Sequence, residues 1–228
     1  MTIINKINKI KPVIRLIGSK YRLFNQLYKH FNLSSITKFY DVFGGTGIVG
    51  INIKNINPNI EVYINDYDNI LPLTKKFVED NNKRFNGFGG YSQAAIQQYN
   101  KKVLNGLWTK LKIYNNVLKN INISHLDYKE LLNSHSFNNN DLIYLDPPYF
   151  SNFKAYKHKI NLDDFFKFIL FFNSKNNCKI AISFKYNEKI LNLFKNWNIY
   201  YLNHTNTNIS TIKKDKNANE ILITNFKE

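Results

Sequence analysis

Residues 141–149 read Asp-Leu-Ile-Tyr-Leu-Asp-Pro-Pro-Tyr, an apolar run that ends in a carboxylate, two prolines and an aromatic ring. The first five residues have the length and composition of a buried strand. Because proline has no N–H to donate to a sheet, Pro147 and Pro148 stop that strand. In an open α/β fold, parallel strands deliver their carboxyl ends into the crevice that binds ligands. The stretch therefore predicts an α/β protein with Asp146 at a candidate active site.

The four residues from Asp146 to Tyr149 suit methylation of the exocyclic amine of a nucleobase. The amine nitrogen of adenine is a poor nucleophile because its lone pair is delocalised into the ring. The Asp146 carboxylate and the Pro147 carbonyl can each accept one amine hydrogen, which favours a pyramidal nitrogen with an available lone pair. Tyr149 would stack on the base, which must first be flipped out of a duplex. The alternative is purely structural, a strand end followed by a packed tyrosine.

A second motif lies upstream, where a β-rich run ends in Gly44-Gly45-Thr46-Gly47-Ile48-Val49-Gly50. Its last six residues spell G-x-G-x-x-G, which permits a tight turn and close approach of the backbone to a ligand. A further apolar run, residues 61–65, leads into Asp66, about twenty residues past the glycines, as expected for a carboxylate on ribose hydroxyls. NAD enzymes and S-adenosylmethionine enzymes both show this pattern, and Asp66 alone can merely cap a helix. The Asp-Pro-Pro-Tyr motif favours S-adenosylmethionine, since hydride transfer has no use for it.

With these motifs in this order, the chain resembles the adenine-N6 DNA methyltransferases of the Dam type, the D12 class with an Asp-Pro-Pro-Tyr motif. The resemblance runs nearly end to end and is carried by residues 18–20, 43–47, 65–66, 123–128, 146–149, 152–156 and 219–226. It implies a catalytic tetrad of Asp146, Pro147, Pro148 and Tyr149. It also implies S-adenosylmethionine as cofactor, bound by Lys20, Phe43, Gly44, Gly45, Gly47, Asp66, Asp127 and Asp146. Lys20 and Asp127 have plainer interpretations, as a solvated surface lysine and as a cap at the end of a strand.

Alternating apolar periodicities predict the fold class, an α/β protein with a mostly parallel, Rossmann-like methyltransferase sheet and helices on both faces. Strands are expected near residues 37–43, 61–65, 121–126, 141–146, 178–184, 198–203 and 220–226. Helices are expected near residues 20–31, 47–55, 68–80, 161–175 and 187–196. The resemblance further implies that the last strand of the sheet is antiparallel to the others.

Residues 81–118 do not follow this alternation. They pass through a turn-rich segment into a helical stretch with several lysines and Trp108. The resemblance implies a DNA target-recognition insertion here, so the expected organisation is a methyltransferase domain of residues 1–80 and 119–228 interrupted by residues 81–118. A long solvent loop with an amphipathic helix is the alternative. Lys213, Lys214 and Lys216 form a second basic segment that suits phosphate contacts.

The composition fits a nucleic-acid partner. The 228 residues include 32 Lys and Arg against 16 Asp and Glu, a formal net charge of +16. This excess predicts an acidic polymer as partner, although many lysines and asparagines can also reflect an AT-rich genome. The single cysteine, Cys178, excludes a disulfide within the chain, and the 5 histidines show no metal-ligand spacing, so no metal is expected. With no long apolar run and no signal-peptide pattern, we expect no membrane contact and a location in the cytoplasm or another intracellular compartment that contains DNA.

These observations predict a site-specific adenine-N6 methyltransferase that transfers a methyl group from S-adenosylmethionine to a flipped-out adenine in double-stranded DNA. A methyltransferase that modifies adenine in RNA would use the same tetrad and stays open. A non-catalytic descendant that only binds nucleic acid is a further alternative, which the intact tetrad and Asp66 disfavour. A cognate restriction endonuclease in the same system is a partner that the resemblance allows.

Overall fold

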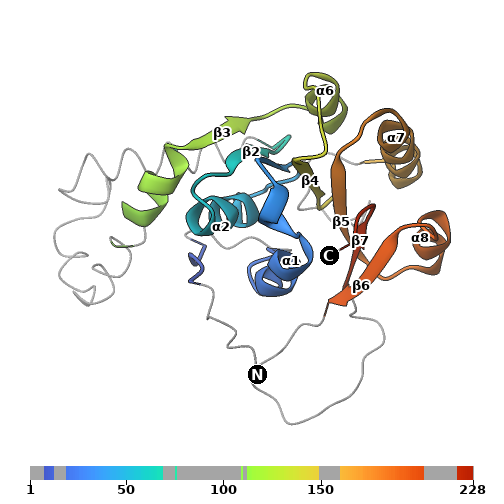
Figure 1. Cartoon of the computed structure of the whole chain (residues 1–228), viewed down its shortest axis with the longest axis horizontal. Coiled ribbons are helices and arrows are strands. Elements are labelled where there is room, and N and C mark those ends of the chain that lie inside the picture. Colours follow the sequence, from blue (N-terminus) through green and yellow to red (C-terminus); the bar gives the residue numbers. More distant parts are fainter. Residues whose placement is uncertain are drawn as a thin grey trace, which may run out of the picture.

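A single seven-stranded sheet organises the part of the chain that the structure describes. The structure is a computed structural model, and it describes residues 8–12, 19–68, 75, 109, 112–148, 160–202 and 220–227. The strands are β1 Lys38–Asp41, β2 Glu61–Asn65, β3 Ile121–Ser124, β4 Asp141–Leu145, β5 Lys179–Lys185, β6 Asn198–Leu202 and β7 Glu220–Thr224. They lie in the order β3-β2-β1-β4-β5-β7-β6, which can be followed in Figure 1.

The sheet is parallel except at its last strand. β1 pairs in parallel with β2 and β4, β2 with β3, and β4 with β5. β7 lies between β5 and β6 and is antiparallel to both. The predicted mostly parallel, Rossmann-like sheet is therefore confirmed, and each expected strand is present with its ends moved by a few residues.

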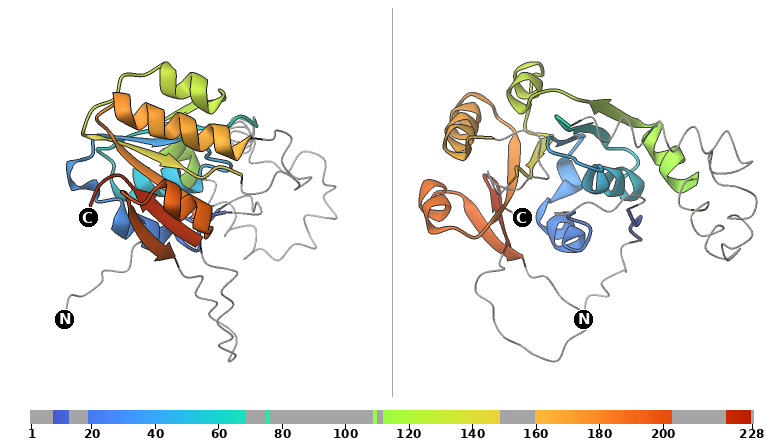
Figure 2. Two further views of the ribbon diagram at one scale, coloured as in Figure 1. Left: turned by 90° about the vertical axis from the view of Figure 1, so that its right-hand side faces the viewer. Right: turned by 180° about the vertical axis from the view of Figure 1, so that it is seen from behind.

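Helices cover both faces of this sheet. They are α1 Phe24–His30, α2 Ile48–Ile56, α6 Tyr128–Asn133, α7 Leu162–Lys175 and α8 Glu188–Leu193, with a short 3-10 helix at Leu33–Ser35. Figure 2 shows α1 and α2 on one side of the sheet and α6 and α7 on the other. The two apolar clusters follow this division, since one holds the buried side chains of α1 and α2 and the other those of α6, α7 and α8.

The four residues of β4 that follow Asp141 show why this strand has no polar alternation. Successive side chains of a strand point to opposite faces. Leu142 and Tyr144 belong to the cluster under α1 and α2, whereas Ile143 and Leu145 belong to the cluster under α6 and α7. Because helices cover both faces, the strand has no solvated side and needs no polar alternation.

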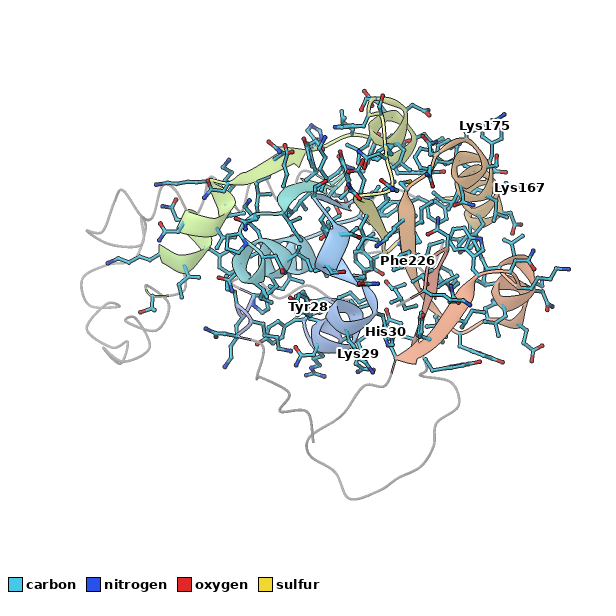
Figure 3. The ribbon with its side chains drawn as sticks, viewed as in Figure 1. Tyr28, Lys29, His30, Lys167, Lys175 and Phe226 are labelled. Carbon is cyan, nitrogen blue, oxygen red and sulfur yellow. The ribbon has the colours of Figure 1, made fainter. Side chains whose placement is uncertain are left out.

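Helix α7 illustrates how local sequence fixes an element. The Asn161 side chain accepts hydrogen bonds from the backbone N–H groups of Asp163 and Asp164, which caps the amino end. Phe165, Phe166, Ile169 and Phe172 are buried, whereas Phe171 is 62% exposed. Lys167 and Lys175 point outward from the same helix in Figure 3. The periodic pattern thus gives one buried and one solvated face.

The described residues differ from the predicted layout by one extra α-helix, and one predicted region lies largely outside them. Helix α6 was not expected, because its six residues are too few to show a clear helical period. The expected helix near residues 68–80 and nearly all of residues 81–118 lie outside the described residues. At the end of that region residues 112–118 are helical, and Tyr114 and Leu118 are buried in the cluster of α1 and α2.

Asn65 joins the ends of three strands. It is the last residue of β2 and only 2% exposed. Its side-chain amide donates to the carbonyl oxygens of Val42 and Leu126 at 3.1 and 2.9 Å. Its side-chain oxygen accepts from the Ser124 hydroxyl and from the Leu126 N–H, both at 2.8 Å. One buried side chain therefore satisfies backbone groups that follow β1 and β3.

We expect Asn65→Ala to lower the free energy of unfolding by about 2–4 kcal/mol, because each buried polar group left without a partner costs about 1–3 kcal/mol. Urea denaturation measures this. Asn122→Ala is the matched control, since that exposed amide only bonds Glu61 at the surface, and its effect should stay within about 0.5 kcal/mol. Equal effects of the two substitutions would contradict the role assigned to Asn65.

Candidate active site

The carboxyl ends of the parallel strands bring three acidic residues to one edge of the sheet. Asp41 ends β1, Asp66 follows β2 and Asp146 follows β4. β1 lies between β2 and β4, and the chain runs outward from this centre in opposite directions on its two sides. Such a topological switch point is where open α/β sheets bind ligands. The sequence-predicted Asp66 and Asp146 therefore share one crevice edge, with Asp41 between their strands.

The glycine loop joins β1 to α2 at this edge. Gly45 and Gly47 have φ values of 55° and 72°, in the left-handed region that side chains disfavour. The Gly44 N–H donates to the Asn65 carbonyl at 2.8 Å, and a β-carbon at Gly44 would overlap the Ile64 side chain. The loop thus lies close against the end of β2, with Gly44 and Gly45 half-buried. This is the arrangement expected of a loop that binds a ligand through its backbone.

Asp66 is held against that loop. Its Oδ2 accepts from the Gly45 N–H at 2.7 Å, and its Oδ1 accepts from the Asp68 N–H at 2.9 Å. Burial raises the pKa of Asp66, and the two backbone hydrogen bonds only partly offset this. The carboxylate therefore lies beside the loop where a ribose would be expected.

Two other predicted cofactor residues have structural contacts. The Phe43 ring packs against the rings of Tyr128 and Phe165, with centroids 5.7 Å away in each case. Asp127 is the N-cap of α6, and its Oδ1 accepts from the Lys129 N–H at 2.8 Å. Phe43 thereby ties the loop to α6 and α7, and Asp127 fixes the start of α6.

Asp41 is a site residue that the sequence analysis missed. It is 2% exposed, and its Oδ2 accepts from the Gly50 N–H at 3.1 Å. Burial, together with the nearby charges of Asp146 and Asp66, raises the pKa of Asp41 to about 7, against the opposing effects of the Gly50 hydrogen bond and Lys20. Its position at the end of a strand, just before a glycine loop, was the available signal.

Lys20 forms ion pairs with Asp146 and Glu220. Its Nζ is 2.7 Å from Asp146 Oδ2 and 3.1 Å from Glu220 Oε1, and the residue is only 5% exposed. Burial by itself lowers the pKa of Lys20, but the two carboxylates outweigh burial and leave that pKa raised. The interpretation of Lys20 as a solvated surface residue is therefore wrong. Glu220, from the start of β7, is a second charged residue that sequence reasoning did not assign to the site.

The other oxygen of Asp146 has its own partner. Asp146 Oδ1 accepts a hydrogen bond from the Ser183 hydroxyl at 3.0 Å. Ser183 in turn lies 2.8 Å from the Tyr144 hydroxyl. Pro147 is buried and Pro148 half-buried directly after Asp146. One carboxylate oxygen of Asp146 thus contacts Lys20 and the other accepts from Ser183 on β5.

Several predicted residues lie outside the described part of the chain. They are Tyr149, Gly18, residues 152–156, Trp108 and the basic segment with Lys213, Lys214 and Lys216. Among the described residues, no group of three or more His, Cys, Asp or Glu side chains is placed to hold a metal ion. No helix in the same residues is long and apolar enough to cross a membrane.

Comparison with known proteins agrees with the site. The family model described as D12 class N6 adenine-specific DNA methyltransferase matches residues 16–88, which include Lys20, the glycine loop and Asp66. About a third of the chain is therefore similar to the family model of this D12 class. The family resemblance predicted from the sequence is thereby confirmed.

Two relatives of this chain are named as modification enzymes. The chain is 24% identical to modification methylase StsI of Streptococcus sanguinis and 25% identical to type II methyltransferase M.FokI of Planomicrobium okeanokoites. Each alignment covers 95% of this chain but 43% of the relative. The chain therefore spans less than half of the length of these two relatives.

Solved structures support the fold. The chain is similar to a human methyltransferase 10 domain-containing protein, with a TM-score of 0.53 and 10% identity over 96% of this chain and 88% of that one. It is also similar to a putative rRNA-methylase from Clostridium thermocellum, with a TM-score of 0.52 and 9% identity over 92% and 98% of the two chains. Identities this low support the Rossmann-like methyltransferase fold alone.

The titration of Asp41 should be visible in the pH dependence of stability. Because its pKa is higher folded than unfolded, the folded state binds the proton more tightly, and stability falls as pH rises from the ordinary 3.8 through about 7. Asp41→Asn keeps an oxygen acceptor for the Gly50 N–H but cannot titrate. We expect urea unfolding at a series of pH values to show a flatter dependence for the variant, by on the order of a few kcal/mol at most. The exposed Asp163 supplies the control Asp163→Asn, and a variant slope equal to that of the wild type would refute this assignment.

Proposed function

We propose that this chain is an S-adenosylmethionine-dependent methyltransferase that methylates N6 of a flipped-out adenine in double-stranded DNA. The observation that carries the proposal is the fixed position of the Asp146 carboxylate. It stands at the topological switch point, with Lys20 on one oxygen and Ser183 on the other. The D12-class match supplies the reaction class.

The residues at the edge fit S-adenosylmethionine. Asp66 offers carboxylate oxygens to ribose hydroxyls next to the Gly45 backbone. Lys20 pairs with the carboxylates of Asp146 and Glu220, and the buried Asp41 lies within reach of the charges of Asp146 and Asp66. This local excess of acid suits a cationic methyl donor. When bound, the cofactor supplies an electrophilic methyl group, and the residues proposed to hold it are Lys20, Phe43, Gly44, Gly45, Gly47, Asp66, Asp127 and Asp146.

Asp146 acts on the amine of the target base. A carboxylate oxygen has two lone pairs, so a contact with Lys20 or Ser183 uses only one acceptor position of the oxygen that makes it. One amine hydrogen bonds to Asp146 and the other to the Pro147 carbonyl, which directs the nitrogen lone pair at the methyl carbon. The amine nitrogen would take the methyl group from the bound cofactor, which leaves as S-adenosylhomocysteine, and the proton lost from the amine would pass to the Asp146 carboxylate that accepts its hydrogen bond and then to water. We propose that Pro148 stiffens the turn and Tyr149 stacks on the base.

Double-stranded DNA is the proposed substrate. The net charge of +16 favours a polyanion, and the two related enzymes are named as a modification methylase and a type II methyltransferase. On the basis of these names, we propose that residues 81–118 form a target-recognition insertion in a methyltransferase domain of residues 1–80 and 119–228. We also propose that a restriction endonuclease is a partner. A compartment that contains DNA is the corresponding location.

The proposal is tested by incubating the purified chain with isotopically labelled S-adenosylmethionine and either duplex DNA or RNA. Nucleosides released by digestion are then analysed by mass spectrometry. We expect labelled N6-methyladenine in DNA. If the label were found only in RNA, RNA and not DNA would be the substrate. If neither polymer carried the label, the proposed activity would be overturned.

Asp146→Ala should abolish transfer because it removes the acceptor for the amine. Loss of one well-placed electrostatic group commonly lowers kcat by about 100–1,000-fold. Circular dichroism should show an intact fold. Asp163→Ala, on the exposed face of α7, is the control and should keep the wild-type rate. A near-normal rate in Asp146→Ala would remove this residue from the mechanism.

Asp66→Ala should act on cofactor binding. We expect the dissociation constant for S-adenosylhomocysteine, measured by calorimetry, to rise about 10–100-fold, as for loss of hydrogen bonds to a charged group. Asp163→Ala should bind as the wild type does. If the wild-type chain bound NADH and not this analogue, the glycine loop would belong to a dehydrogenase site instead.

A further inference from the structure

A buried series of hydrogen bonds leads from the core of the sheet to Asp146. Tyr144 lies on β4 and Ser183 on β5, and both side chains are fully buried. The Tyr144 hydroxyl is 2.8 Å from Ser183 Oγ, and Ser183 Oγ is 3.0 Å from Asp146 Oδ1. Neither Tyr144 nor Ser183 is part of the Asp-Pro-Pro-Tyr motif or of the glycine loop.

The chemistry of the three groups fixes the direction of these bonds. Lys20 at 2.7 Å favours the ionised form of Asp146, which can only accept hydrogen bonds. The one hydroxyl hydrogen of Ser183 therefore goes to Asp146, and Ser183 must accept from Tyr144. Burial, and after it the charge of Asp146, raises the pKa of Tyr144 well above its ordinary value, so its hydroxyl stays protonated and able to donate.

The sheet and the aromatic core hold these groups in place. In the register of β4 with β5, Leu145 is opposite Ile182, so the next residues, Asp146 and Ser183, follow side by side. The Tyr144 ring contacts the Phe31 ring edge-on, with centroids 5.2 Å apart. Neither hydroxyl therefore depends on a surface loop for its position.

We propose that Ser183, oriented by Tyr144, is a positioning residue that fixes the plane of the Asp146 carboxylate for the target amine. Lys20 holds one carboxylate oxygen and Ser183 the other, so the side chain cannot rotate away from the crevice. This inference rests on the proposed methyl transfer. It differs from a role in stability alone, because positioning acts on the chemical step and leaves substrate binding largely unchanged.

The test measures kcat and both KM values for Ser183→Ala and Tyr144→Phe in the full chain. We expect kcat to fall about 10–100-fold in Ser183→Ala, the usual effect of losing one hydrogen bond to a charged group. A smaller fall is expected in Tyr144→Phe, and both KM values should stay within about threefold. The matched control is Thr224→Val, which removes another buried hydroxyl of the sheet that donates to the Phe226 carbonyl at 2.7 Å. It should lower the melting temperature but not kcat.

The double variant distinguishes a series of bonds from two independent effects. If Tyr144 acts through Ser183, then Tyr144→Phe should change kcat little once Ser183 is alanine, so the two effects are not additive. Additive losses, or a wild-type kcat in Ser183→Ala, would overturn the inference while leaving the methyltransferase proposal intact. An inactive wild-type chain would overturn both.

Discussion

The ion pair between Lys20 and Asp146 is the interaction on which the candidate site depends. A buried charge is costly to remove from water, and removing one partner of such a pair typically costs about 3–5 kcal/mol. Here the ammonium group is shared with Glu220, and the carboxylate is also bonded to Ser183. The buried charges of Lys20 and Asp146 are therefore stabilised, because each has more than one partner and these partners come from different elements. The same arrangement gives the carboxylate a fixed orientation before any substrate arrives.

The edge of the sheet combines two opposite electrostatic requirements. The chain as a whole is strongly basic, which suits a polyanionic partner. Its crevice edge is locally acidic, and the raised pKa of Asp41 reflects the neighbouring carboxylates as well as burial. The net positive charge of the chain would thus attract a polyanion over long range, whereas the acidic residues at the edge of the sheet would act on a bound ligand at short range.

Sequence reasoning succeeded where the signal is local. The apolar run before Asp146, the glycine loop and the spacing to Asp66 each lie within one segment, so periodicity and motif rules could find them. It missed Ser183, Glu220 and Asp41. Ser183 reaches Asp146 because β5 lies beside β4, and Glu220 reaches Lys20 from the start of β7. No local sequence pattern predicts which distant strands become neighbours. The raised pKa of Asp41 comes from its burial and from the neighbouring Asp146 and Asp66, which only the folded structure brings together.

The position of β7 has a consequence for when the site can form during synthesis. β7 enters the sheet between β5 and β6, and its first residue, Glu220, pairs with Lys20 from the opposite end of the chain. A nascent chain that has emerged only as far as β6 lacks both the neighbour of that strand and the second carboxylate on Lys20. Contacts of such long sequence separation form late and slowly. Lys20 would therefore be held between both carboxylates only after β7 has been made.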